Sequence, residues 1–533
     1  MFKSVLALLF VIIHLSIFQS ARAQDVAFDD IVKALPEASF RTLPATLDKA
    51  ATLDDERVAT LFARLLEGDV YFHPKTQQVM YATKTQGERA WIDTLTEKNI
   101  VESSGVRLRK VRVNNRVRSH IRQLLAQRNL SHRDDTVRLQ ASESLLADVD
   151  SISTKVILSR LEQEENADII EVLTAITALK RLKNDDVTEQ LGALETLRGS
   201  LYPEVRVALL SLQRDSEVSD TVKANVDAVL AGIEAKRKWF GWAETAFFGI
   251  SMGSVLLLAA IGLSITFGVM GVINMAHGEM IMLGAYTTYV IQQAFPNLIE
   301  YSLLMAVPAA FLVSGLMGVI IERSVIQFLK GRPLETLLAT FGISLILQQL
   351  VRTVFSPLNR QVASPEWMSG SWQINPVFSV TFNRLYIIIF SLAVFFSLLL
   401  FLKKSSLGLH VRAVAQNRDM ARALSVKSNW VDAATFGLGS GIAGVAGVVL
   451  SQLTNVGPNL GQAYIIDSFL VVVFGGVANL WGTLVSAMTL GVLNKFLEPV
   501  TGPVLATIIV LVGLVLFIQK RPMGLFPQKG RAE

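Results

Sequence analysis

The sequence predicts a mainly α-helical protein, in which a polytopic α-helical membrane domain is preceded by an exported, largely helical domain with a few short strands. The composition supports this, because 51% of the 533 residues are hydrophobic and only 18% are charged, which is too apolar for a soluble protein of this size. The distribution supports it as well. Up to about Trp239 the chain is charged like an ordinary globular protein, whereas from Thr245 it is almost continuously apolar, as membrane helices require.

The N-terminus has the pattern of a secretory signal peptide. Lys3 is followed by an apolar run, Val5–Phe18, and by the cleavage pattern Ala21-Arg22-Ala23, which predicts a signal peptide over residues 1–23. The run is short for a membrane span, and the alternative is an uncleaved anchor. Both interpretations place the next segment outside the cytoplasm, so residues 24–238 are expected to form a periplasmic domain.

The first part of this domain combines helical spacing with short strands. Apolar and charged residues recur at helical spacing up to Glu67. Residues 69–73 and 78–82 then have the composition of two short strands joined by a turn, and 106–113 alternates like a third strand.

The second part of the domain is helical from about Asn115 and repeats. Arg138, Glu171 and Arg206 mark similar stretches at steps of 33 and 35 residues, a period that predicts stacked helix pairs resembling HEAT repeats. Such solenoids present extended binding surfaces, so the domain is expected to dock a partner. The alternative is an extension with no ligand of its own.

The membrane domain, residues 239–533, contains a series of apolar runs separated by loops. Positive charge marks the loops near Arg323 and over 403–427, and the C-terminus, as cytoplasmic. An outside N-terminus and an inside C-terminus require an odd number of spans, which favours splitting the run 464–493 near Asn479 and gives nine. The runs are Thr245–Gly271, Met280–Phe295, Tyr301–Ile321, Leu334–Phe355, Leu385–Leu402, Ala433–Leu453, Tyr464–Leu493 and Pro503–Ile518. The loop 355–382 is expected to hold a short interfacial helix.

A polar segment, Asn274–Glu279, interrupts the apolar stretch between Gly262 and Gly284. Ionisable residues inside a membrane are costly and usually functional, and discontinuous helices often line a transport path. The segment therefore predicts a broken helix at a functional site. The alternative is a polar turn at the membrane surface.

Several chemistries have no support in the sequence. The absence of cysteine excludes disulfides and thiolate metal sites, and no other metal, catalytic or nucleic-acid pattern is present, so no cofactor is expected. The net charge of +5 suits membrane lipid better than nucleic acid. Gly439–Gly444 matches G-x-G-x-x-G, but it lies within an apolar run, which favours helix packing. No G-x-x-x-x-G-K-[ST] motif occurs, so ATP hydrolysis would need another chain.

The loop near 403–430 predicts a short amphipathic helix after a glycine turn. Val411, Val414 and Ala415 share one face of this helix, and Arg412 and Gln416 lie on another. Such a helix is too polar to span the membrane and is expected to dock into a partner's groove. The alternative is an interfacial helix without a partner.

Four stretches resemble the branched-chain amino acid and urea permease family of ABC importers: Gly268–Tyr286, Leu337–Gln348, Leu407–Leu424 and Val472–Thr483. Within this family, the exported extension and the C-terminal ending most resemble the urea-transporting permeases. The resemblance implies a multi-pass permease of the bacterial inner membrane, working with a second permease subunit, two ATPase subunits and a periplasmic urea-binding protein.

The expected function is therefore ATP-driven import of urea, with this chain as a non-enzymatic membrane subunit. The alternatives are an importer of branched-chain amino acids or short amides and, from another class, a membrane-anchored periplasmic scaffold. A path for a neutral polar solute needs uncharged hydrogen-bonding groups. The expected path residues are Asn274, Gln348, Gln349 and Asn455, with His277 and Glu279 gating the path or bracing the break. The expected coupling residues are Leu407, Gly408, Arg412, Gln416, Asn417, Arg418, Met420 and Leu424.

Overall fold

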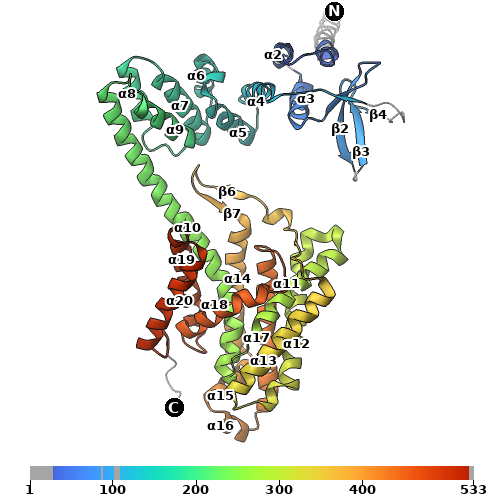
Figure 1. The fold of residues 1–533 in the computed structure, drawn as a ribbon, viewed down its shortest axis with the longest axis vertical. Helices are drawn as coiled ribbons and strands as arrows, with labels where there is room; N and C mark the ends of the chain where they lie inside the picture. Colours follow the sequence, from blue (N-terminus) through green and yellow to red (C-terminus); the bar gives the residue numbers. More distant parts are fainter. Residues whose placement is uncertain (1–27, 54, 86–87, 101–107, 527–533) are drawn as a thin grey trace, which may run out of the picture. The chain divides into compact units, whose positions relative to one another are not determined.

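The computed structural model describes residues 28–53, 55–85, 88–100 and 108–526. The chain divides into two compact units with a boundary between Lys236 and Arg237. Both units are mainly helical (Figure 1), which confirms the predicted class. The predicted signal peptide, residues 1–23, lies outside the described residues. The domain limits 24–238 and 239–533, and the export of the first domain, stay predictions.

The first unit begins with helices packed against a small sheet. Residues 28–34 are helical and are followed by α2 (Leu43–Ala51) and α3 (Glu56–Glu67). The five-stranded antiparallel sheet has the order β4-β3-β2-β1-β5. Its strands are β1 (Val70–Phe72), β2 (Val79–Thr85), β3 (Glu88–Asp93), β4 (Asn99–Ile100) and β5 (Arg109–Lys110). The predicted hairpin is confirmed as β1 and β2, the third strand is shorter than predicted, and β3 and β4 were not predicted.

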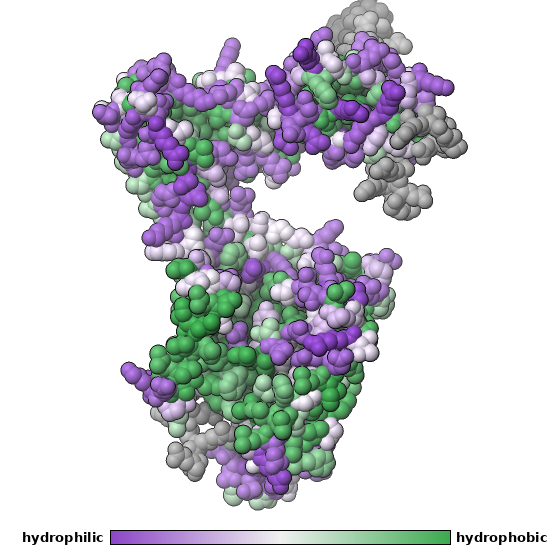
Figure 2. All heavy atoms as spheres, in the orientation of Figure 1, coloured by the Kyte–Doolittle hydropathy of each residue, from purple (hydrophilic) through white to green (hydrophobic). Residues whose placement is uncertain are grey.

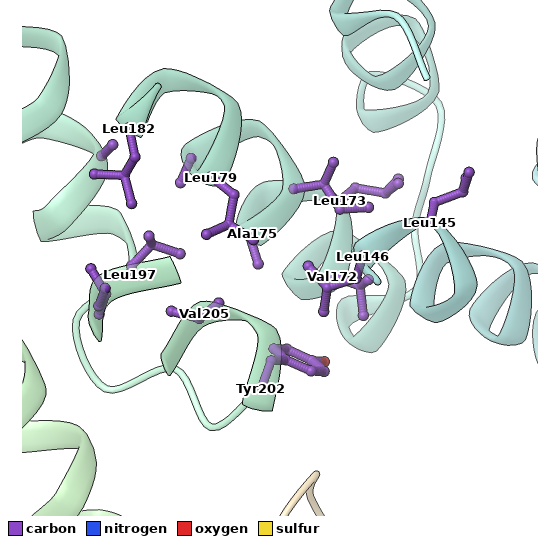
Figure 3. Close-up of a cluster of buried hydrophobic side chains, with 14 of the residues drawn as sticks. Leu145, Leu146, Val172, Leu173, Ala175, Leu179, Leu182, Leu197, Tyr202 and Val205 are labelled. Carbon is purple, nitrogen blue, oxygen red and sulfur yellow. The ribbon is translucent and has the colours of Figure 1, made fainter. Parts of the chain in front are cut away.

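A series of helices completes the first unit. Their buried side chains share one core, in which Leu145 and Leu146 of α5 meet Val172 and Leu173 of α7 and Val205 of α9 (Figure 3). The helices are α4 (Asn115–Asn129), α5 (Asp135–Leu146), η1 (Val149–Ser151), α6 (Thr154–Leu161), α7 (Ala167–Leu182), α8 (Val187–Thr196) and α9 (Pro203–Arg214). Arg138, Glu171 and Arg206 fall on α5, α7 and α9. The HEAT-like repeat stays a prediction.

A buried carboxylate holds α5 and α6 to the start of α7. Glu164, whose side chain is only 1% exposed, accepts hydrogen bonds from Arg138 at 2.8 and 2.9 Å and from Arg160 at 2.7 Å. The backbone amides of Glu165 and Asn166 also donate to it. These donors stabilise the charged form, so they lower the pKa of Glu164 from 4.5 to about 2.

The described part of the second unit contains nine long helices. They are α10 (Asp220–Met270, which begins in the first unit), α11 (His277–Ala294), α12 (Ile299–Ser324), α13 (Pro333–Phe355), α14 (Phe382–Lys404), α17 (Ser428–Ser451), α18 (Leu460–Gly475), α19 (Leu480–Thr501) and α20 (Pro503–Lys520) among the described residues. Figure 2 shows apolar residues, in green, gathered on this unit's surface. Exposed apolar side chains of α12, α13, α14 and α20 contribute to it, as expected of a surface that meets lipid.

Seven helices within the described ranges are long and apolar enough to cross a membrane, two fewer than predicted. The seven are α10, α12, α13, α14, α17, α19 and α20. The other two long helices of the second unit, α11 and α18, are not among these seven. α18 has only 16 residues, and α11 carries polar residues in its first turn. Most of α11 is buried by other helices, so it does not need the apolar surface of a lipid-facing span.

Two connections refine the predicted boundaries. The run 464–493 is split as predicted, but the break lies at 476–479, where Gly476 and Ala478 have φ of 100° and 66°. Asn479 caps α19 by accepting a hydrogen bond from the Gly482 amide at 3.1 Å. The predicted interfacial helix in 355–382 is wrong apart from one short turn, η4 (Glu366–Met368). The loop instead forms a hairpin of β6 (Ser371–Gln373) and β7 (Ser379–Thr381).

Helix α17 lies at the centre of the second unit, and nine-tenths of the residues in its most apolar stretch are buried. Its glycines let neighbouring backbones come close, because an ideal Cβ on Gly447 would lie 1.9 Å from the Ile281 carbonyl oxygen of α11. A Cβ on Gly439 would lie 2.6 Å from the Gly262 carbonyl oxygen of α10. The G-x-G-x-x-G sequence is therefore a helix-packing surface, as predicted.

Candidate functional site

The polar segment lies where the chain passes from α10 to α11. Helix α10 ends at Met270, Gly271 has a positive φ of 65°, and α11 begins at His277. Asn274 stabilises the turn, since its Oδ1 accepts a hydrogen bond from the Ala276 amide at 3.0 Å. The predicted helix break is present, and Asn274, His277 and Glu279 are all buried. A turn exposed at the membrane surface does not fit this burial.

His277 ties the start of α11 to α10. Its side chain is fully buried, and Nε2 lies 2.8 Å from the Ala259 carbonyl oxygen of α10. A carbonyl oxygen only accepts hydrogen bonds, so Nε2 carries a proton in this contact. In the neutral ring Nδ1 is then an acceptor.

A polar stripe on α13 faces the break. Thr336, Thr340, Ser344, Gln348 and Arg352 follow one another at four-residue intervals, which places them on one side of the helix. Three members bind the polar segment: Thr340 Oγ1 accepts from the Met275 amide at 3.2 Å, while Ser344 Oγ and Gln348 Nε2 donate to Glu279 Oε1 at 2.9 and 2.8 Å. Arg352 donates to Asn459 Oδ1, just before α18, at 2.8 Å.

Three buried polar atoms of the break have no hydrogen-bond partner among the described residues. They are Asn274 Nδ2, His277 Nδ1 and Glu279 Oε2. A buried polar group without a partner costs about 1–3 kcal/mol. The break can therefore offer a polar molecule one amide donor, one imidazole acceptor and one carboxyl oxygen.

The structure brings together four of the six predicted path residues. Gln348 joins Asn274, His277 and Glu279 in the buried cluster. Gln349 and Asn455 are exposed, and no hydrogen bond joins either side chain to the cluster in the described part of the chain. Gln349 leaves the stripe because the next residue on a helix is rotated by about 100°.

Thr340 and Ser344 belong to the cluster and were not predicted. The four-residue spacing from Thr336 to Arg352 was the signal that pointed to them.

The loop after α14 forms two short helices, where one was predicted. α15 (Ser406–Gln416) is capped by Ser405, and α16 (Arg418–Ala423) is capped by Asn417, whose Oδ1 accepts from the Met420 amide at 3.0 Å. Gly408 is not a turn but a residue of α15, where an ideal Cβ would lie 2.1 Å from the Leu402 carbonyl oxygen. Its lack of a side chain lets α15 pack against the end of α14.

The two helices have an apolar inner face and a partly apolar outer face. Val411, Val414 and Ala421 are buried. Leu409, Met420 and Leu424 are 59%, 60% and 76% exposed. Of the predicted coupling residues, Arg412 and Gln416 are exposed and Leu407 is half-buried, whereas Arg418 points inward and binds Asp432 of α17. The described residues hold no group of three His, Asp or Glu side chains placed to bind a metal.

Comparison with known proteins finds one family model and several permease relatives. The family model described as branched-chain amino acid transport system / permease component matches residues 245–519. The permease protein BraD of Pseudomonas aeruginosa, named for high-affinity branched-chain amino acid transport, is 30% identical over 296 residues, covering 54% of this chain and 94% of its own. LivH of Escherichia coli K12, with the same description, is 28% identical over 307 residues, covering 54% and 96%. The ribose import permease RbsC of that strain is 26% identical over 255 residues, covering 46% and 75%. No solved structure matches significantly.

Proposed function

We propose that this chain, which belongs to the family of branched-chain amino acid transport permease components, forms half of the membrane path of an ATP-driven importer in a bacterial inner membrane. Members of this family are transporter subunits, so the chain is a transporter component and not an enzyme. The observation that carries the proposal is the family match over residues 245–519, which holds all seven candidate spans apart from the start of α10 and the last residue of α20.

The buried break between α10 and α11 is the proposed solute path. Hydrogen-bonding groups inside a membrane are costly unless they serve a passing solute or hold a helix. Glu279, Ser344 and Gln348 satisfy one another on one side, while Asn274 Nδ2, His277 Nδ1 and Glu279 Oε2 are left for a solute. Gln349 and Asn455, which are exposed, are not part of the proposed path.

The proposed solutes are branched-chain amino acids, the class named in the descriptions of BraD and LivH. Such a solute carries an ammonium and a carboxylate. Glu279 Oε2 is placed to accept from the ammonium. The Asn274 amide, beside the positive end of α11, is placed to donate to the carboxylate.

Urea is the second candidate. The observation that favours it is the long N-terminal part of the chain, which lies before the matched residues 245–519 and resembles the urea-transporting branch. Urea is neutral, so it would use the same amide and imidazole groups without needing the Glu279 charge. The scaffold alternative, with inert spans, does not fit membership of a permease family.

The proposed partners are inferred from the motifs this chain lacks and the surface it exposes. The sequence has no phosphate-binding loop, so two ATPase subunits would drive the cycle. The exposed apolar residues Leu409, Met420 and Leu424 of α15 and α16 are the proposed surface for one of them. A second permease subunit would complete the path, and a periplasmic binding protein would deliver the solute.

Uptake of labelled leucine and labelled urea in cells that lack this chain tests the proposal. We expect the full-length chain to restore leucine uptake at low micromolar solute. Loss and restoration of urea uptake alone would instead select the second candidate. If neither leucine uptake nor urea uptake is restored, although the chain is present in the membrane in normal amounts, both proposed solutes are refuted.

A matched pair of variants tests the path. Gln348→Leu removes a ligand of Glu279, whereas Gln349→Leu makes the same change one residue along on an exposed surface. We expect Gln348→Leu and Asn274→Leu to lower uptake by about tenfold or more, because each leaves buried polar atoms unsatisfied in the path, and Gln349→Leu to leave it unchanged. Equal uptake by all three variants would remove this break from the path.

A further inference from the structure

A cluster of charged side chains around two buried carboxylates joins α12, α16 and α17. Glu322, near the end of α12, and Asp432, near the start of α17, have side chains with 0% exposure. Lys330, in the connection between α12 and α13, places its Nζ 2.7 Å from Asp432 Oδ2 and 3.5 Å from Glu322 Oε1. Lys330 therefore holds the two carboxylates, and the ends of α12 and α17, together.

The second cation of the cluster comes from α16, which holds the predicted coupling residues Arg418 and Met420. Arg418, the first residue of α16, donates from Nη1 to Asp432 Oδ2 at 2.7 Å and from Nη2 to Asp432 Oδ1 at 2.9 Å. Two parallel bonds of this kind fix direction as well as distance, and they are among the stronger hydrogen bonds in proteins. Asp432 is fully buried, so the pair is shielded from solvent on that side.

A second polar side-chain contact between α16 and α17 is weaker. Arg422 Nε donates to Ser428 Oγ at 2.9 Å, which is a single bond to a neutral acceptor. Arg422 also lies 3.9 Å from Asp419, whose side chain is 94% exposed, and such surface pairs contribute little. Arg418 is thus the stronger of these two side-chain connections.

Movement of α17 would reach the polar break directly. Gly444 and Gly447 of α17 meet α11 backbone to backbone, at Gly284 and at the Ile281 carbonyl oxygen. Contacts of this kind have no flexible side chain between them to absorb a shift, and close-packed interiors transmit displacement. α11 carries His277 and Glu279 at its start.

We propose that the Arg418–Asp432 pair is the link by which movement of α16 is passed to α17, and from α17 to α11. Arg418 acts as a positioning residue in this cycle, because it touches neither nucleotide nor solute. Lys330 has a different role, since it holds Asp432 against α12 whatever α16 does. The inference rests on the proposed transport function.

The first test compares Arg418→Gln with Arg422→Gln in the full complex with its ATPase subunits, reconstituted into lipid vesicles. Both variants make the same change on the same helix. Arg418→Gln leaves Asp432 paired with Lys330, so the fold is expected to persist, and the thermal midpoint of the complex checks this. We expect Arg418→Gln to keep ATP hydrolysis but to lower the solute imported per ATP by about tenfold, and Arg422→Gln to keep the ratio. Equal ratios in the two variants would overturn the proposal.

The second test does not depend on the solute. The chain has no cysteine, so Asp419→Cys and Trp430→Cys, both at exposed positions outside the proposed ATPase surface, place one spin label on α16 and one on α17 of the full complex. With Arg418 present, we expect the distance between the labels to stay the same with and without ATP. With Arg418→Gln it is expected to change on ATP binding.

A distance that changes with ATP while Arg418 is present would overturn the link even if uptake is normal. A complex that imports neither leucine nor urea would refute the proposed function, and the label distances would still report on the link.

Discussion

The contact between Gly284 and Gly444 gives a sharp test of the packing around the break. An ideal Cβ on Gly284 would lie 1.9 Å from the carbonyl oxygen, 2.5 Å from the carbonyl carbon and 2.6 Å from the Cα of Gly444. All three atoms belong to the backbone, so no rotamer change can make room. Gly284→Ala therefore has to move α11 away from α17.

The size of the effect can be worked out from this distance. An ordinary contact needs roughly 3.4 Å, so the helices would separate locally by about 1.5 Å, and overpacking of this kind costs about 1–3 kcal/mol. The backbone contact places the cost near the upper end of that range. Replacing glycine by alanine inside a helix returns about 1 kcal/mol, which leaves a net destabilisation of about 2 kcal/mol.

Gly342 is the matched control. It lies within α13, and no atom of another element lies within 4 Å of the Cβ it would gain. Gly342→Ala is therefore expected to be neutral or stabilising. We expect the thermal midpoint of the purified complex in lipid nanodiscs to fall by about 4–8 °C for Gly284→Ala and not to fall for Gly342→Ala. Uptake is expected to fall with Gly284→Ala as well, because α11 carries the polar break.

Equal midpoints for the two variants would refute the reasoning. They would mean that α11 and α17 are further apart than the structure places them, and that their contact does not transmit movement.

Two further predictions concern Glu164 in the first unit and Leu424 in the second. Glu164→Gln is expected to destabilise α5–α7 by about 3 kcal/mol at pH 7. Because the folded pKa of Glu164 is lowered to about 2, its contribution is full above about pH 4.5 and is lost as the pH falls towards 2. Hydrogen exchange of these helices in the full chain at pH 7 and pH 3 measures it, and an equal difference at both pH values would contradict it. Leu424→Asp, on the exposed face after α16, is expected to weaken ATPase binding by about tenfold or more in co-purification. Val207→Asp, an exposed change in the first unit, is expected to leave it unchanged, and equal losses would argue against the docking surface.

Local chemistry made the polar break predictable. Asn274, His277 and Glu279 interrupt an apolar stretch, and such an interruption is visible without any knowledge of neighbouring helices. The division of 464–493 was predicted in another way, because an outside N-terminus and an inside C-terminus require an odd number of spans and the polar residue Asn479 offered a place for the break. The two short helices α15 and α16 were predicted as one helix. Asn417 caps α16, but in the sequence it cannot be told from the other polar residues of an amphipathic helix.

Partners from distant segments were not predictable from one sequence. Gln348 and Gln349 are adjacent and chemically identical, and only the direction of α13 decides which of them meets Glu279. The cluster around Asp432 depends on Lys330, which is 102 residues away, and no local pattern connects the two. The strands β3 and β4 were not identified by the strand composition and turn that identified β1 and β2, so pairing with the existing hairpin decides their structure.

The glycine contacts of α17 also limit how this part of the chain can change by mutation. Every missense change in a glycine codon adds at least a Cβ, which at Gly284 or Gly447 would meet the backbone of the opposite helix and at Gly444 would meet Ser314 and Ala310 of α12. The atoms opposite Gly284 are backbone atoms of Gly444, and those opposite Gly447 are backbone atoms of Ile281 and Ala285, so no smaller residue on the opposite helix could make room. The contact between α11 and α17 is therefore expected to tolerate no single amino-acid replacement at these glycines.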